Sequence, residues 1–338
     1  MSYFGIPIRN GASVGLGSII SLLSGSRSAP SLSLNFLSGS LDSQITFTRA
    51  STGTYFDSAG VLQTAAVNAP RFDYNPSTLA AQGLLIEAAR TNLVLNSATL
   101  VTQSVTVTAV AHTLSFYGTG TVALSGAFTG SLVGSGAFPT RSTLTFTPAA
   151  GTLTLTVTGS ATQAQLEAGA FATSYIPTTA AAATRAQDLA SVNTLTPWYN
   201  ATQGTLYASY SPLATGLICG AVALSDGTLL NRINIRAMTA SSQTQSIGAD
   251  ANISQWALSF GSATAVFTKS ALGYKLNDIG FTRNGASALT DAAATIPVVN
   301  RLVIGADGDS NFALNGHLQS VIYYPSRLSN AQLRALTV

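Results

Sequence analysis

The chain is poor in charged residues, and few of its basic residues are lysines. Charged side chains make up 8% of its 338 residues, whereas average globular domains contain about 25%. Fifteen residues are basic, of which only Lys269 and Lys275 are lysines. The basic residues are scattered singly along the chain and do not form the positive cluster that nucleic-acid binding requires. We therefore expect no nucleic-acid partner, although the formal net charge is +3.

Cysteine is rarer still, because Cys219 is the single cysteine of the sequence. A lone cysteine forms no intrachain disulfide and leaves no paired-cysteine zinc motif. No apolar run reaches the roughly 20 residues that a membrane-spanning helix needs, so we expect no membrane insertion. The sequence also lacks a Ser-His-Asp signature and a glycine-rich phosphate loop. It therefore predicts no cofactor, no metal site and no enzyme activity.

In place of charge, the chain has short alternating apolar runs. Hydrophobic residues make up 46% of the sequence, which excludes a solvated disordered chain. Between residues 97 and 186 the runs are separated by Gly or Pro turns, which is the pattern of an antiparallel β-sandwich or jelly roll. The predicted strands there are SVTVTAV, HTLSFYG, GTVALSGA, STLTFTP and GTLTLTVTG.

Residues 187–338 predict a second all-β unit. Its expected strands are GTLYASYS, GLICGAVALS, NRINIRAM, QWALSFG, TAVFT, YKLNDIGFTRNG, RLVIGA and LQSVIYY. Ser329 and Gln332 have the spacing of a capping box, so a short helix should close the chain. The sequence thus predicts an all-β protein, with an extended N-terminal arm and a small β-rich module before two sandwich domains.

Much of the scarce charge lies in the small module, residues 31–96, where charged side chains interrupt the apolar runs FTR, PRFDY and GLLIEAAR. A charge buried without a partner is costly, whereas an Arg–carboxylate pair can satisfy itself through two parallel hydrogen bonds. We expect Glu87 to pair with Arg90 or with another arginine of the module rather than to act as a catalytic acid. The predicted structural ion pairs involve Arg49, Arg71, Asp73, Glu87 and Arg90.

Residues 1–30 combine an apolar centre with two arginines and many Gly and Ser residues. A glycine-rich end frays unless a partner holds it, so we interpret this segment as an extended docking arm. Two other interpretations stay open. The segment could pack on its own domain, or it could be a secretory signal peptide with Arg9 as its charged end and Val14–Leu23 as its apolar region.

Four stretches, the first two of which form one module, resemble structural proteins of tailed bacteriophages. FTRASTGTYFDSAGVLQTAAVNAPRFDYNP and GLLIEAARTNLVLNS, at residues 47–76 and 83–97, resemble a module of that family. The module lies there between a particle-anchoring N-terminus and the β-rich outer domains of head spikes and tail fibres. Gln165–Thr179 is similar to the segment that closes a jelly roll in such proteins, and Asn300–Thr337 to the last strands of their concanavalin/laminin-G-like lectin domains.

The resemblance implies a virion structural protein, assembled in the bacterial cytoplasm, that forms a head spike or tail-fibre-type appendage. It implies a homotrimer that is anchored to capsid, portal or tail proteins through residues 1–30. It also implies that the lectin-like residues 187–338 contact host surface polysaccharide. One alternative is a purely architectural decoration or baseplate protein. The other is a tailspike-like glycan depolymerase, which is disfavoured because the chain has no long parallel β-helix repeat and only one Glu after residue 90.

Two features of residues 187–338 could take part in sugar binding. The first is Trp256, whose aromatic face could stack on a sugar ring, with Trp198 and Tyr199 as further aromatic residues near the start of the domain. Such residues also fill cores and subunit contacts, so a packing role is the alternative interpretation.

The second feature is the alternation of oxygen-bearing residues Asp307, Asp309 and Asn311, which has the spacing of calcium-loop ligands. The loop pattern then fails, because Phe312 stands where an EF-hand needs Gly and Leu318 where it needs Glu. The sequence favours a polar turn at this position, and whether the turn binds calcium stays open.

Overall fold

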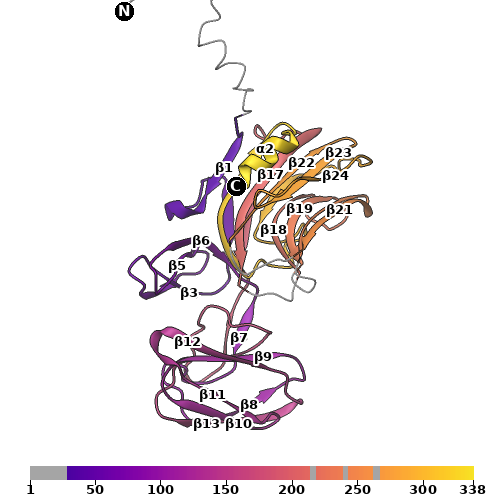
Figure 1. The fold of residues 1–338 in the computed structure, drawn as a ribbon. Helices are drawn as coiled ribbons and strands as arrows, with labels where there is room; N and C mark the ends of the chain where they lie inside the picture. Colours follow the sequence, from indigo (N-terminus) through magenta and orange to yellow (C-terminus); the bar gives the residue numbers. More distant parts are fainter. Residues whose placement is uncertain (1–28, 214–217, 239–242, 262–266) are drawn as a thin grey trace, which may run out of the picture.

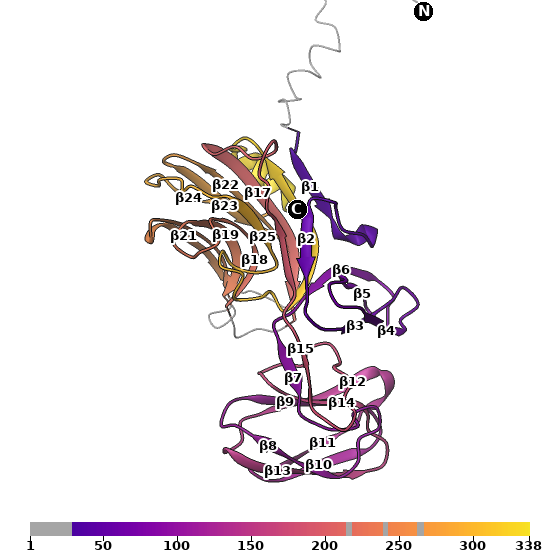
Figure 2. The same cartoon turned by 180° about the vertical axis from the view of Figure 1, so that it is seen from behind.

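The computed structural model describes residues 29–213, 218–238, 243–261 and 267–338, which form two β-sandwich units. Figures 1 and 2 show a larger sandwich that carries the C-terminus and a smaller one joined to its end. The predicted all-β class with antiparallel sandwiches is confirmed. Apart from Ala29 and Pro30, the predicted arm lies outside the described residues. None of the described helices is long and apolar enough to cross a membrane.

The first sheet of the larger sandwich has the strand order β24-β23-β22-β17-β26-β6-β5, and β1 also pairs with β26. All of its pairings are antiparallel. Its strands are β1 (Leu32–Asn35), β5 (Phe72–Tyr74), β6 (Ala81–Ile86), β17 (Gln203–Pro212), β22 (Thr268–Lys275), β23 (Asp278–Arg283), β24 (Leu289–Asp291) and β26 (Gly316–Tyr324).

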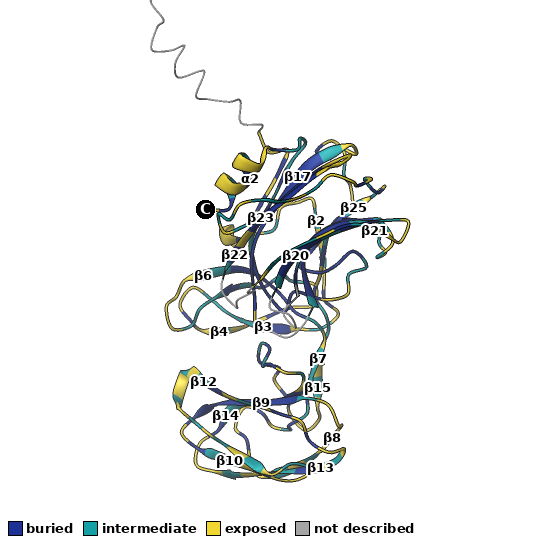
Figure 3. Ribbon diagram, turned by 45° about the vertical axis from the view of Figure 1, so that its right-hand side comes forward, coloured by how far each residue is buried: buried dark blue, intermediate teal, exposed yellow. Residues whose placement is uncertain are grey.

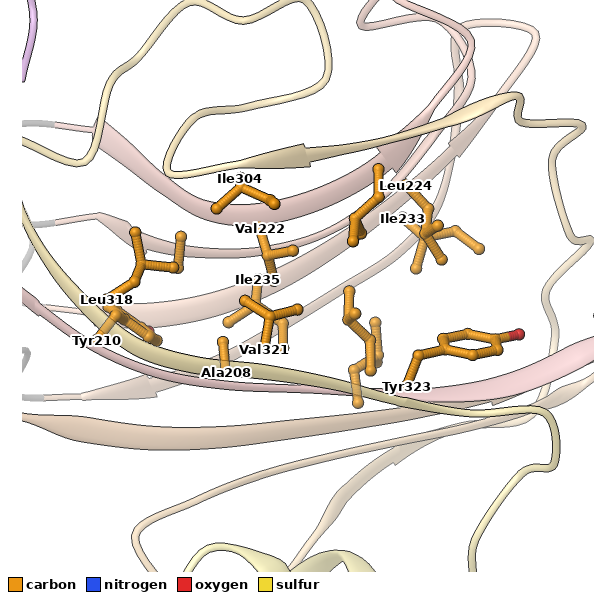
Figure 4. Packing of buried hydrophobic residues seen from close by; sticks show 14 of the residues in the cluster. Ala208, Tyr210, Val222, Leu224, Ile233, Ile235, Ile304, Leu318, Val321 and Tyr323 are labelled. Carbon is orange, nitrogen blue, oxygen red and sulfur yellow. The ribbon is translucent and has the colours of Figure 1, made fainter. Parts of the chain in front are cut away.

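The second sheet has the order β2-β16-β25-β18-β19-β20-β21 and is also antiparallel. Its strands are β2 (Ile45–Thr48), β16 (Leu189–Val192), β18 (Ile218–Ser225), β19 (Arg232–Met238), β20 (Gln243–Asp250), β21 (Ile253–Gly261) and β25 (Arg301–Ile304). Figure 4 shows how the apolar side chains of the two sheets meet between them, with Val222 and Ile235 facing Ala208 and Val321. Each large aliphatic side chain buried there contributes about 1.5–3 kcal/mol.

The smaller sandwich is made by residues between β7 (Arg90–Asn92) and β15 (Ala183–Arg185). One sheet has the order β11-β10-β13-β8 and the other β12-β9-β14. Its strands are β8 (Gln103–Val107), β9 (His112–Gly118), β10 (Thr121–Gly126), β11 (Gly130–Val133), β12 (Gly136–Phe146), β13 (Gly151–Thr158) and β14 (Thr162–Ala168). It has a core of its own, to which both sheets contribute, for example Phe116 and Leu166 from one and Val122 and Leu155 from the other.

Two strands connect the units: β7 (Arg90–Asn92), on which the chain leaves the larger sandwich, pairs with β15 (Ala183–Arg185), on which it returns. A small hairpin of β3 (Gly53–Phe56) and β4 (Leu62–Ala65) lies on the side of the larger sandwich that faces the smaller one.

The strand pairing differs from the division expected at residue 96. Four strands of residues 31–96 are built into the sheets of residues 187–338, since β1 and β6 pair with β26, β5 pairs with β6, and β2 pairs with β16. The physical reason is that a short strand such as LSLN has one apolar face and gains stability only by joining a larger sheet. The smaller sandwich is therefore an insertion between two halves of the larger one.

The C-terminal helix α2 (Asn330–Leu336) forms where the capping box predicts it. The Ser329 hydroxyl accepts from the Gln332 N–H, and the Gln332 side chain accepts from the Ser329 N–H. Leu333 of α2 packs with Tyr207 and Ala271 on the outer side of the first sheet. Figure 3 shows the opposite side of the helix exposed. A 3-10 turn, η1 (Phe36–Ser38), follows β1.

Candidate functional site

A buried ion network lies where the two units meet. The guanidinium of Arg71 is 2.8 Å from a carboxylate oxygen of Glu87, and that of Arg185 is 3.1 Å from the same oxygen. Asp188 binds Arg49 at 3.0 Å and also contacts Arg71. The side chains of all five residues are at most 1% exposed. Three arginines and two carboxylates thus pair with each other away from water, as buried charges ordinarily do.

The electrostatics of the network fix the charge of Glu87. Burial alone would raise the pKa of this carboxyl, but the guanidinium groups of Arg185 and Arg71 hold it well below its usual range. The hydroxyl and the backbone N–H of Ser174 add to this effect by donating hydrogen bonds of 2.6 and 2.8 Å to the carboxylate. Ser174 follows β14 in the inserted unit, so the network fastens that unit to the larger sandwich.

Beside the network, a cleft of about 170 Å³ opens between the two units. The larger sandwich supplies β3, the β5–β6 pair and the start of β26 to its walls. The inserted unit supplies β9, β12 and residues 172–175. Ligand sites occur preferentially at such domain interfaces, so this cleft is the candidate functional site.

On the larger sandwich, Asp73 and His317 form a buried pair at the cleft. The His317 Nε2–H donates to the Asp73 carboxylate at 2.8 Å, and the backbone N–H of Phe56 donates to the other carboxylate oxygen at 2.7 Å. With Nε2 as the donor, the Nδ1 atom of a neutral imidazole is an acceptor. Nδ1 makes no hydrogen bond to any residue that the structure describes. Asp73 therefore orients a ring whose second nitrogen can accept from a ligand.

On the inserted unit, Arg141 and Tyr117 line the opposite wall. Arg141 donates to the Thr173 carbonyl at 2.6 Å and to the Ser115 hydroxyl at 2.7 Å, while its Nε has no partner among the described residues. The Tyr117 side chain is only 5% exposed, and its hydroxyl likewise makes no hydrogen bond within the described part of the chain. Burial raises the pKa of Tyr117, so this hydroxyl stays protonated and can donate.

An aromatic bridge crosses the junction next to these groups. Phe138 of β12 lies with its ring centroid 5.5 Å from that of Phe56 on the larger sandwich and 5.3 Å from that of Tyr117 on its own unit. Phe138 is 42% exposed, so its ring is open to a ligand at this position. The junction thus combines an aromatic face with unsatisfied donors and an acceptor.

Trp256, the aromatic residue predicted to stack on a sugar, lies in the core of the larger sandwich. It is 2% exposed, and its indole N–H donates to the Ser246 hydroxyl at 3.0 Å. Its ring occupies the space above Gly248, where an added Cβ would lie 2.2 Å from a ring carbon. Trp198 is also buried and packs edge-on against Tyr323, so the packing interpretation holds for both tryptophans.

The three oxygen-bearing residues Asp307, Asp309 and Asn311 lie in a polar turn, in which the Asp307 N–H donates to the Asn311 carbonyl at 2.9 Å. Asp307 is 1% exposed and accepts from the Asn234 amide at 2.7 Å, with the guanidinium groups of Arg232 and Arg236 each 3.7 Å away. Two positive neighbours balance the charge of this carboxylate and disfavour a cation. The Asp309 carboxylate instead accepts from the backbone and side chain of Asn311. The described residues contain no group of metal-ligating side chains.

The residues expected to form structural ion pairs lie at the junction, with some different partners. Glu87 binds Arg71 and Arg185 rather than Arg90, and Arg90 lies 3.8 Å from Glu167 of the inserted unit. Asp73 pairs with His317. Sequence reasoning missed the other cleft residues, Tyr117, Arg141 and His317, because each is a single polar residue within a strand and no local motif marks it.

Neither a family model nor a curated protein matches the chain. Similar solved structures include the CBM40 of the Ruminococcus gnavus IT-sialidase bound to α2,3-sialyllactose, with 17% identity over 41% of this chain and 84% of that one, at a TM-score of 0.37. A leech intramolecular trans-sialidase has 19% sequence identity over 41% of this chain and 23% of that one, with a TM-score of 0.36. The botulinum neurotoxin serotype D binding domain has 12% sequence identity over 44% of this chain and 40% of that one, with a TM-score of 0.35. These likenesses cover less than half of this chain and assign it neither ligand nor activity.

Proposed function

We propose that this chain is a structural protein of a bacteriophage virion, a head spike or tail-fibre-type appendage that binds host surface glycans. One observation carries the glycan part: Tyr117 and His317 bring hydrogen-bonding atoms without a partner among the described residues from two units to one cleft, which Arg141 also lines. The virion part is supported by the resemblance of residues 47–76 and 83–97 to the module of phage appendage proteins.

The chemistry of the cleft suits a sugar ring. Sugar hydroxyls both donate and accept hydrogen bonds, so they can accept from Tyr117 and Arg141 and donate to the Nδ1 of His317. The exposed ring of Phe138 can lie against the apolar face of a sugar. At about 170 Å³ the cleft is smaller than the roughly 300 Å³ typical of complete small-molecule sites. It therefore fits one ring of a longer glycan, and affinity on a cell would come from several copies acting together.

The same cleft favours binding over hydrolysis. Glycoside hydrolysis ordinarily uses two carboxyl groups, one of which must carry a proton. The carboxylates among its described lining residues are Asp73 and Glu87. Glu87 is locked between Arg71 and Arg185, which keep its pKa low, so it has no proton to deliver at neutral pH. We therefore propose a non-enzymatic role.

The decisive experiment measures binding of the full chain to extracted host polysaccharide by titration calorimetry, with Tyr117→Phe as the probe. This change removes one hydroxyl that has no partner among the described residues, so the protein should keep its melting temperature and lose about 3–10-fold in affinity. Tyr210→Phe is the matched control, because Tyr210 is buried in the core of the larger sandwich and should not affect binding.

Two outcomes would contradict the proposal. If neither the full chain nor its multimer binds host cells or extracted polysaccharide, the protein has a purely architectural role. If binding is present but unchanged in Tyr117→Phe and in Phe138→Ala, the sugar site lies elsewhere on the molecule.

The virion part is tested on particles. Electron microscopy of intact particles labelled with an antibody to this chain should locate it on the head or tail, and light scattering should show a trimer. Deletion of residues 1–28 should abolish incorporation into particles while the melting temperature of the truncated protein stays unchanged. Normal incorporation of the truncated protein would refute the docking arm, and a monomer at micromolar concentration would refute the trimer.

A further inference from the structure

The inserted unit has a second, larger pocket at the end that adjoins the linker strands β7 and β15. Its volume is about 410 Å³, within the range of roughly 300–1,000 Å³ typical of ligand sites. Residues of β8, β9 and β14, which belong to both sheets of the unit, contribute to its walls together with β7 and β15. The pocket is therefore the open end of a sandwich and not an irregularity between loops.

A buried histidine lines this pocket with one free nitrogen. His112 is 1% exposed, and its ring packs against Phe146 at a centroid distance of 6.3 Å. Its Nδ1 lies 2.8 Å from the Val110 carbonyl oxygen, which can only accept, so Nδ1 carries the hydrogen. The Nε2 of the neutral ring is then an acceptor, and it makes no hydrogen bond to any described residue. The fold fixes this ring and leaves its acceptor unused.

A positioned arginine supplies donors to the same pocket. The Arg90 guanidinium lies over the Phe171 ring at 5.4 Å and donates to the Ala89 carbonyl at 3.1 Å through Nη1, whereas its Nη2 has no hydrogen bond to the described residues. Gly169 leaves room for the Arg90 side chain, because a Cβ atom added at residue 169 would lie 3.1 Å from Nε and 3.2 Å from Nη2 of Arg90. The arginine side chain is 20% exposed, so it remains accessible from the pocket.

Hydroxyl groups complete the lining. Thr106 and Thr108 are exposed, and their hydroxyls make no hydrogen bond to other described residues. The pocket therefore offers an acceptor on His112, donors on Arg90 and hydroxyls that can do either. Neighbouring hydroxyls of a saccharide require this mixture, since each hydroxyl both donates and accepts.

We propose that this pocket is a second saccharide-binding site, which recognises adjacent ring hydroxyls between His112 and Arg90. It goes beyond the proposed function, because it lies on the inserted unit and its linker strands and does not need the cleft between the units. It rests on the proposed function only in taking host surface glycan as the source of the sugar. With two sites, each chain could hold two points of one polysaccharide, which would raise its effective affinity.

The chain allows the two sites to be observed separately, because its two histidines are His112 in the pocket and His317 in the cleft. Histidine labelled with carbon-13 gives one imidazole signal for each, assigned with His112→Gln. The full chain is titrated with glucose, galactose, N-acetylglucosamine and oligosaccharides released from the host polysaccharide. We expect a saturable shift of the His112 signal with at least one of them.

Matched threonine variants test the contacts. Thr108→Val removes one pocket hydroxyl at nearly constant volume and should weaken the binding seen at His112 by about 3–10-fold. Thr143→Val, at an exposed position of the same unit outside the pocket, should leave it unchanged. If the His112 signal does not move with any sugar, the pocket proposal is overturned, whether or not His317 responds. A response of His112 with a silent His317 would instead overturn the cleft.

Discussion

The Asp188 carboxylate lies 3.0 Å from the Arg49 guanidinium, although the two residues are 139 positions apart in the sequence. The inserted unit lies between them in the chain, so this contact forms only after the two halves of the larger sandwich have come together. Asp188 also accepts from the backbone N–H of Glu87 at 2.9 Å, which ties the exit of the insertion to its entrance. One buried cluster therefore joins the two halves of the larger sandwich to each other and to the inserted unit.

Glu87→Gln should strongly destabilise the protein. Glutamine keeps the shape of the side chain but removes the charge that balances Arg71 and Arg185, both of which stay buried. Breaking a buried ion pair from one side typically costs about 3–5 kcal/mol, and urea unfolding should show a loss of that order. A lower midpoint with an unchanged denaturant slope would identify it as a stability effect.

Asp278→Asn is the control for this change. Asp278 also pairs with an arginine, Arg327, at 3.0 Å, but its side chain is 55% exposed. Exposed pairs are worth about 0–1 kcal/mol, so this variant should unfold close to the parent midpoint. Equal losses in the two variants would mean that burial of the network is not what makes Glu87 important.

The stability of the protein should fall in acid, partly through Glu87. Its pKa in the fold lies well below its ordinary value of 4.5. The interactions that lower this pKa stabilise the folded protein fully at pH values above the ordinary pKa of 4.5. This stabilisation is lost as the pH falls from 4.5 toward the lower pKa that Glu87 has in the folded protein. Urea unfolding at pH 7, 5, 4 and 3 should show this decline.

Other carboxylates contribute to the same decline, for example Asp57, whose pKa the backbone N–H of Val61 lowers. The contribution of Glu87 is isolated by comparing the parent with Glu87→Gln, whose stability should fall less steeply below pH 4.5. Parallel pH profiles of the two proteins would show that Glu87 does not take part in acid unfolding.

Local sequence patterns predicted the strands well and their partners poorly. The alternating runs of residues 97–186 correspond to strands β8, β9, β10, β12 and β13, because period-two alternation follows directly from the pleat of a strand. Pairing depends on contacts that alternation does not encode. LSLN has the same pattern whether it begins a separate module or lies beside β26, 285 or more positions later.

The candidate site was hidden for a related reason. Asp73 and His317 are 244 positions apart, and only the pairing of β5 with β6 and of β6 with β26 brings them together. A sequence can indicate that a charged residue within an apolar run needs a partner, as it did for Asp73. It cannot indicate which distant residue is the partner before the sheet order is known.

Trp256→Ala should destabilise the fold without a specific effect on sugar binding. Which face of β21 points inward was not evident from its sequence, and the structure places this ring in the core. Removing a buried tryptophan typically costs about 3–5 kcal/mol, partly through the cavity it leaves. Differential scanning calorimetry should show a lower melting temperature. Binding per folded molecule should stay at the parent value.

Trp256→Phe serves as the control, since it keeps an aromatic ring in the core and loses only the hydrogen bond to Ser246 and part of the volume. Its loss of stability should be clearly smaller. A variant at this position that stays fully folded but no longer binds glycan would restore Trp256 as a binding residue.

The inserted unit should fold by itself when residues 90–186 are produced alone. Its core, from Val94 to Leu166, is made by its own strands, and its ends are held side by side by the β7–β15 pairing. The fragment loses the Glu87 carboxylate, which binds both Arg185 and Ser174 in the full chain, so its stability should be lower than that of the same unit within the full chain. Cooperative urea unfolding with the circular dichroism of a β protein is the expected result.

Adding residues 31–89 and 187–338 as a second, separate polypeptide should not be needed for that transition. A fragment that remains unfolded would show that the insertion depends on the larger sandwich for folding.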